Sequence, residues 1–133
     1  MKKNNKIIIG IITTIILMIV AFATYETATW NKEYYISEKN LEIPIFVYHD
    51  IVENKEQIEY DYMQTDKETF EKQINGLLKL GYKVISYEDL VKYKNGEIPI
   101  NKHTCLIDFD DGYEGNYKIA LDIIKKYNIP KIT

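Results

Sequence analysis

The sequence of 133 residues contains no arginine, so all 17 of its basic residues are lysines, against 20 acidic residues. Arginine makes the bidentate contacts that recognise phosphate and guanine, and the formal net charge is -3, so we expect no nucleic-acid partner. The single cysteine, Cys105, excludes an intrachain disulfide and a zinc site built from several thiolates of this chain. Hydrophobic residues make up 46% of the chain, which is typical of a folded domain rather than a disordered one.

An uncharged run from Ile7 to Tyr25 follows three lysines among the first six residues. As a helix this run would extend about 28 Å, close to the hydrocarbon thickness of a bilayer. The basic flank predicts a cytoplasmic amino terminus and an extracellular domain. Two interpretations stay open. Residues 1–25 are either a signal anchor that holds the chain in the cell membrane or a signal peptide cleaved after Ala23, because Ala21-Phe22-Ala23 has the A-x-A pattern of cleavage sites. The length of the run favours the anchor.

The rest of the chain alternates predicted strands and helices after a polar linker at residues 26–41. Runs of β-branched and aromatic residues predict strands, and apolar residues at helical spacing predict helices. The predicted strands are 43–49, 82–85 and 104–109, with a further one entered at 131–133, and the predicted helices are 65–80, 86–93 and 116–127. Residues 50–62 are expected to form a charged loop.

This alternation predicts an α/β fold with a mostly parallel sheet, whose functional residues lie at the carboxyl ends of the strands. A closed β/α barrel needs about 200 residues or more. The sequence therefore predicts an incomplete barrel of three or four strands.

Three carboxylates, Asp108, Asp110 and Asp111, gather where the predicted strand 104–109 ends. Like charges held close together destabilise one another, so a bound divalent cation would stabilise such a group. Aspartate oxygens suit zinc as well as harder cations, and Gly112 permits a sharp turn beside them. A solvated acidic turn is the simpler alternative.

Two known motifs fit this acidic stretch poorly. An EF-hand loop needs glycine at its sixth position, whereas Gly112 is fifth when the count starts at Asp108. The haloacid-dehalogenase phosphatase pattern matches Asp108 and Asp110 but requires threonine or valine where Gly112 stands. A phosphate substrate in the cytosol also fits badly with an export signal.

The stretch IDFDDGY, residues 107–113, resembles the first motif of the polysaccharide deacetylases, the NodB-like carbohydrate esterase family 4, in which Ser or Thr precedes Phe-Asp-Asp-Gly. A strand ending in Val47-Tyr48-His49, the segment KETFEKQINGLLKLGYKVIS at 67–86 and a helix ending in KKYNIP are similar to the start of such domains in the same order. The resemblance covers about 43–133, so residues 42–133 are identified as the amino-terminal part of a polysaccharide deacetylase domain.

The resemblance implies a distorted (β/α) barrel of the NodB/glycoside hydrolase-deacetylase type and metal-dependent removal of N-acetyl groups from N-acetylhexosamine units of a cell-envelope or extracellular polysaccharide. It implies that Asp110 is the general base and that Asp111 is a ligand of a divalent metal, zinc by expectation. His49, Tyr113 and Asp108 are further candidates for the mouth of the active site. The implied partners are an N-acetylated glycan and, through residues 7–25, the membrane.

The sequence departs from the family pattern in two ways. Asp108 stands where the family has threonine or serine, and the pair of histidines spaced HxxxH that completes the family's metal site is absent, since the chain has only His49 and His103. A catalytic zinc ion commonly takes three protein ligands, which one carboxylate does not supply. A function of a different class therefore stays open: a non-catalytic truncated remnant, or a membrane-anchored glycan-binding module.

Overall fold

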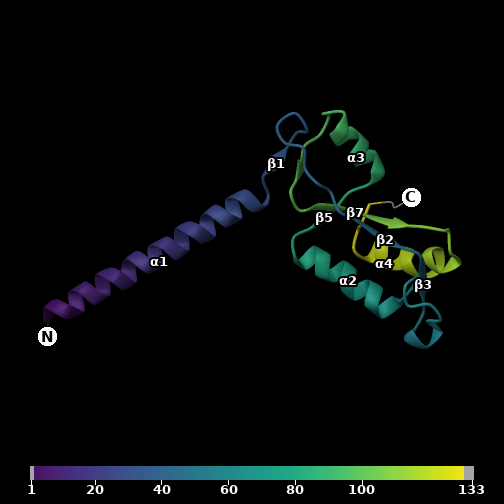
Figure 1. Cartoon of the computed structure of the whole chain (residues 1–133), viewed down its shortest axis with the longest axis horizontal. Coiled ribbons are helices and arrows are strands. Elements are labelled where there is room, and N and C mark those ends of the chain that lie inside the picture. Colours follow the sequence, from purple (N-terminus) through teal and green to yellow (C-terminus); the bar gives the residue numbers. More distant parts are fainter. Residues whose placement is uncertain (1, 131–133) are drawn as a thin grey trace. The chain divides into compact units, whose positions relative to one another are not determined.

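The computed structural model describes residues 2–130, so the strand predicted to begin at 131–133 lies outside the described residues (Figure 1). The chain divides into two compact units, Met1–Lys32 and Glu33–Thr133. Each unit is described by itself below.

The first unit is the helix α1 (Lys2–Trp30), which confirms the predicted hydrophobic helix at the amino terminus. Its segment Ile7–Trp30 is long and apolar enough to cross a membrane, and residues 7–28 of it are exposed. The hydroxyl groups of Thr13, Thr14 and Thr27 donate hydrogen bonds to backbone carbonyls four residues earlier. A helix that satisfies its own polar groups in this way is suited to an apolar solvent.

The second unit is built on a parallel sheet of three strands in the order β2-β7-β5. Its strands are β2 (Ile45–Tyr48), β7 (Thr104–Phe109) and β5 (Lys83–Val84). Each of the three predicted strands is therefore present. β7 has the predicted bounds, whereas β2 and β5 are shorter than predicted. β7 lies between the other two and is buried over its first four residues. A central strand covered on both faces reads as a continuous apolar run, as TCLIDF does here.

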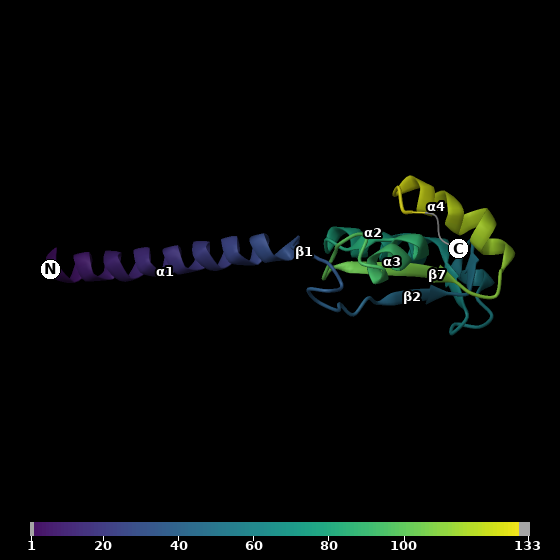
Figure 2. The same ribbon diagram turned by 90° about the horizontal axis from the view of Figure 1, so that it is seen from above.

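Helices cover both faces of this sheet (Figure 1). In the view of Figure 2, which is turned by 90°, α2 and α3 overlap. One face packs on α2 (Lys67–Lys79) and on α4 (Leu121–Lys126), which continues the π-helical turn η2 (Asn116–Ala120). The other face packs on α3 (Tyr87–Lys94). Because side chains alternate along a strand, Ile107 of β7 enters the first core and Leu106 enters the second.

Local signals in the sequence set where these helices begin. The side chain of Asp66 accepts a hydrogen bond from the backbone N–H of Thr69 at 3.0 Å, which caps α2. Ser86 and Asp89 form a reciprocal capping box at the start of α3. Gly81, with φ of 78°, follows α2 in the left-handed conformation that glycine favours.

The structure differs from the sequence-based expectation at residues 50–62, which are not all loop. Residues Asp50–Val52 form β3, which pairs in parallel with β4 (Gln64–Asp66) after the short 3-10 turn η1 (Lys55–Gln57). The side-chain amide of Gln64 donates to Asp50 Oδ2 at 3.0 Å and joins the two strands. Both strands are three residues long, too short to show a period in the sequence.

The segment expected to be a linker, residues 26–41, also contains regular structure. α1 continues to Trp30, and β1 (Glu33–Tyr34) pairs antiparallel with β6 (Ile100–Asn101). The hydroxyl of Tyr93 accepts a hydrogen bond from the N–H of Leu41 and donates one to the carbonyl of Lys39. The last part of the segment is therefore fastened to the α3 side of the domain.

The mixed α/β class is confirmed, and the barrel is not seen to close within residues 2–130. Successive strands of a regular β/α barrel are neighbours, whereas here β7 lies between β2 and β5. The incomplete barrel therefore stays a prediction.

Phe70 tests the core between the sheet and α2. Its side chain is fully buried and contacts Tyr48 edge to face at 4.8 Å between ring centroids, with Phe109 at 5.7 Å. We expect Phe70→Ala to lower the free energy of unfolding by about 3–5 kcal/mol, measured by urea unfolding followed by circular dichroism. Leu80→Ala, at a side chain 62% exposed, is the control and should change it by less than about 1 kcal/mol. Equal effects of the two substitutions would contradict this packing.

Candidate active site

β2 and β7 bring the first residues that follow them to one edge of the sheet. Tyr48 pairs with Phe109 in the parallel register, and the N–H of Asp110 donates to the carbonyl of Tyr48 at 2.8 Å. His49 and Asp110 therefore lie side by side although they are far apart in the sequence. This is the carboxyl edge of the sheet, where open α/β folds bind their ligands.

The acidic loop has a tight backbone conformation. Asp110 Oδ1 accepts a hydrogen bond from the N–H of Asp111 at 2.9 Å, and the Asp110 carbonyl accepts one from the N–H of Gly112 at 2.9 Å. Asp111 and Gly112 have φ of 62° and 65°, a left-handed conformation that aspartate tolerates better than most residues. Both residues are exposed, and their backbone conformations differ, because Asp111 has a positive φ and Asp110 does not.

Two contacts hold this loop against the segment that follows β2. The side-chain amide of Asn116 donates to the carbonyl of His49 at 2.5 Å. Gly115 lies so close to β3 that an added Cβ would be 1.9 Å from the carbonyl oxygen of Ile51. We call the contacts between residues 48–51 and residues 110–116 the interlock. It fixes the acidic loop beside His49.

Asp108 takes part in a different contact. Its Oδ2 accepts a hydrogen bond from the hydroxyl of Tyr87, on α3, at 3.1 Å. Burial, and then this hydrogen bond and the charge of Asp108, raise the pKa of Tyr87, so the phenol keeps its proton and remains a donor. Asp108 thus links β7 to α3, and its membership of the active-site mouth stays a prediction.

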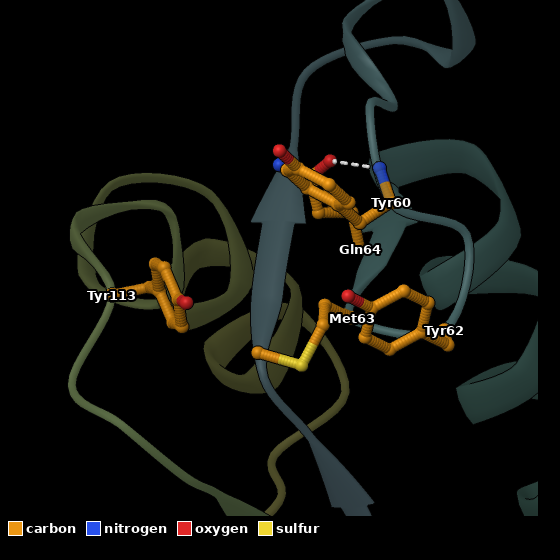
Figure 3. A pocket seen from close by; sticks show the side chains of 5 residues that line it. All are labelled: Tyr60, Tyr62, Met63, Gln64 and Tyr113. Carbon is orange, nitrogen blue, oxygen red and sulfur yellow. Dashed lines mark hydrogen bonds between the residues drawn. The ribbon is translucent and has the colours of Figure 1, made fainter.

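Tyr113 lines two hollows of the surface. One is shared with β3 and the start of η2, and the other with Tyr60, Tyr62, Met63 and Gln64 (Figure 3). Asp110 and Asp111 line neither of these two hollows. Sequence reasoning did not single out Tyr60 and Tyr62, which stand in the stretch Tyr60-Asp61-Tyr62 just before a capped helix.

The described residues do not supply a complete metal site. Among residues 2–130, no three His, Cys, Asp or Glu side chains lie close enough together to hold a metal ion. A catalytic zinc ion commonly takes three protein ligands. The described residues alone therefore do not complete the metal site that the sequence resemblance implies.

Comparisons of the sequence and of the structure with known proteins found several similar ones. No family profile matches the chain. YxkH of Bacillus subtilis (strain 168), provisionally named a polysaccharide deacetylase, is 28% identical over 104 residues, which make up 78% of this chain and 34% of that protein. A de-N-acetylase structure from Aggregatibacter actinomycetemcomitans has a TM-score of 0.60 and 27% identity, over 66% of this chain and 35% of that one.

A third comparison concerns the fold alone. The crystal structure of BC0361, a polysaccharide deacetylase from Bacillus cereus, has a TM-score of 0.51 and 21% identity over 77% of this chain and 28% of that one. This chain spans about a third of the length of the proteins that it matches.

These comparisons define the class of the domain as an α/β domain with neighbours of the deacetylase fold. They also confirm the resemblance seen in the sequence. Over part of its length, this chain is similar to polysaccharide deacetylases in both sequence and structure.

Gly115 tests the interlock. We expect Gly115→Ala to lower the free energy of unfolding by at least about 2 kcal/mol, because the new methyl group collides with the backbone of Ile51. Gly76 is the matched control, since it lies inside α2 with no atom within 4 Å of an added Cβ. Gly76→Ala should raise the same free energy by about 0.5–1 kcal/mol. The measurement is chemical unfolding of both variants, and a neutral Gly115→Ala would contradict the close packing.

Proposed function

We propose that this chain is part of an exported polysaccharide deacetylase, which removes N-acetyl groups from N-acetylhexosamine units of a cell-envelope or extracellular polysaccharide. The observation that carries the proposal is the position of Asp110 beside His49 at the carboxyl edge of the sheet. The similarity to proteins named as deacetylases supports it.

Hydrolysis of an amide needs a group that takes a proton from the attacking water and a group that gives one to the departing amine. In the proposed reaction the water oxygen bonds to the acetyl carbon, and Asp110 takes the proton of the water. The C–N bond then breaks and the sugar nitrogen gains a proton, so acetate and an amine are released. His49 is the neighbouring group whose imidazole can donate a proton, and we assign it to the departing nitrogen.

A divalent metal, zinc by expectation, would supply an activated water and a polarised carbonyl when bound. Asp111 is the residue of this chain that we propose as one ligand. Further ligands would have to come from outside the described residues, because these residues contain no group of three suitable side chains. The same observation favours a second candidate function, a non-catalytic remnant or a membrane-anchored glycan-binding module.

Acetate release separates the two candidates. The chain is incubated with oligomers of N-acetylglucosamine, with and without added zinc or cobalt, and released acetate is measured. If the chain is active, Asp110→Asn should lower the rate about a hundredfold or more, because the amide is no base. Asp122→Asn, at an exposed carboxylate of α4, should leave the rate unchanged. Release that survives Asp110→Asn would contradict the assigned base, and no release from the unaltered chain would favour the non-catalytic candidate.

We also propose that α1 anchors the domain to the cell membrane, with the domain outside. The helix continues unbroken through Ala23, whose carbonyl accepts a hydrogen bond from the hydroxyl of Thr27 at 2.6 Å. The uncharged run from Ile7 to Tyr25 is long enough to span a bilayer, and this length supports retention over cleavage.

Retention is tested by cell fractionation. An anchored chain should stay in the membrane fraction after an alkaline carbonate wash, and a variant that lacks residues 2–25 should leave it. The amino terminus of the exported product is sequenced in parallel. A soluble product that begins at Thr24 would show a cleaved signal peptide instead of an anchor.

A further inference from the structure

We propose that Tyr60, Tyr62 and Tyr113 form a subsite that binds a hexosamine unit next to the one that reacts. This proposal deepens the proposed function and rests on it. The three side chains surround the hollow of about 310 Å³ that Met63 and Gln64 also line. Figure 3 shows Tyr113 on one side of this hollow and Tyr60 and Tyr62 on the other, with Met63 between them.

The three tyrosine side chains are exposed, although large aromatic rings are commonly buried in a folded domain. Tyr62 is 76% exposed, Tyr60 55% and Tyr113 39%. The rings of Tyr60 and Tyr62 are neighbours, with centroids 6.1 Å apart and planes inclined at 64°. An aromatic side chain with one apolar face and one polar end suits a sugar, which presents both C–H groups and hydroxyls. The exposed rings therefore offer binding surface that the core does not use.

The backbone that carries Tyr60 and Tyr62 is held in place before any ligand arrives. Gln64 Oε1 accepts hydrogen bonds from the N–H groups of Glu59 and Tyr60, at 2.7 and 3.1 Å. The N–H of Met63 donates to the carbonyl of Tyr60 at 3.0 Å. The Gln64 amide in turn donates to Asp50. A preformed turn loses little conformational freedom when a ligand binds, which is a property of built binding sites.

The hollow is linked to the candidate active site through two segments of the chain. Tyr113 follows Gly112 of the acidic loop, and Asp50, which holds Gln64, follows His49. One side of the hollow therefore belongs to the segment of the acidic loop, and the other is hydrogen-bonded to the segment that follows β2. A polysaccharide that places one acetamido group at Asp110 has further units on either side, and we infer that the hollow, which Tyr113 lines, holds one of them.

The charged residues near Tyr60 and Tyr62 indicate which class of glycan would bind. The segment 55–64, which carries Tyr60 and Tyr62, has three acidic residues, Glu56, Glu59 and Asp61, against one lysine, Lys55. The net negative charge of this segment repels chains that contain uronic acids and leaves the binding of neutral N-acetylhexosamine units unopposed. It also attracts the ammonium groups of units that have already lost their acetyl group, which aromatic faces bind as well. We therefore infer a neutral to cationic hexosamine chain as the ligand.

Binding is measured by calorimetric titration of the full chain, in detergent micelles, with N-acetylglucosamine and its longer oligomers. The affinity should rise from the single sugar to the longer oligomers. Tyr62→Ala and Tyr113→Ala should each weaken binding of the longer oligomers at least about fivefold, while Tyr62→Phe keeps the ring and most of the affinity. Tyr117→Ala is the matched control, because Tyr117 is 77% exposed and does not line the hollow.

The outcomes separate this subsite from the proposed reaction. Loss of affinity in the two alanine variants but not in the control supports the subsite, whether or not acetate is released. Unchanged affinity in Tyr62→Ala and Tyr113→Ala overturns it, even if the chain releases acetate. Absence of any oligomer binding by the unaltered chain also overturns it. Acetate release, measured separately, decides the proposed function.

Discussion

Gly115 packs against the backbone of Ile51 at a distance that leaves no room for a side chain, and the position of the acidic loop depends on this contact. The Asn116 amide adds a hydrogen bond to the carbonyl of His49, and the Asp110 N–H adds one to the carbonyl of Tyr48. Three contacts of different kinds thus join two segments that are distant in the sequence. Without them, exposed acids on a turn would have no fixed relation to His49, and neither proposed role would have a geometric basis.

The sheet explains how charged residues come to follow a buried strand. β7 is covered by α2 and α4 on one face and by α3 on the other, so its apolar residues are fixed by two cores. The fully buried part of β7 stops before Asp108, which is half-buried and accepts a hydrogen bond from the hydroxyl of Tyr87. Asp110, two residues later, is exposed to solvent. Burial therefore sets the register of β7, and the register carries the acids to the edge where His49 lies.

The sequence predicts the features that depend on neighbouring residues, and not those that depend on distant pairing. Asp66 and Ser86 are caps that sit next to the helices they start, and the apolar run of β7 marks its own burial. β3 and β4 have no such signal, because they are short and stable only as a pair. Gly115 and Gly76 look alike in the sequence, and only the fold shows that the first is packed and the second is open. The grouping of Tyr60 and Tyr62 with Tyr113 depends on the same distant contacts.

Hydrogen exchange at the amide of Asp110 tests the central claim most directly, since that claim is the pairing of the strand ends beside His49. The amide donates to the carbonyl of Tyr48 at 2.8 Å, while its own side chain is exposed. The account predicts that it exchanges as slowly as the amide of Leu106, which donates to the carbonyl of Pro44 in the same ladder. Exchange of Asp110 at the rate of an unstructured peptide, with Leu106 still protected, would contradict the account.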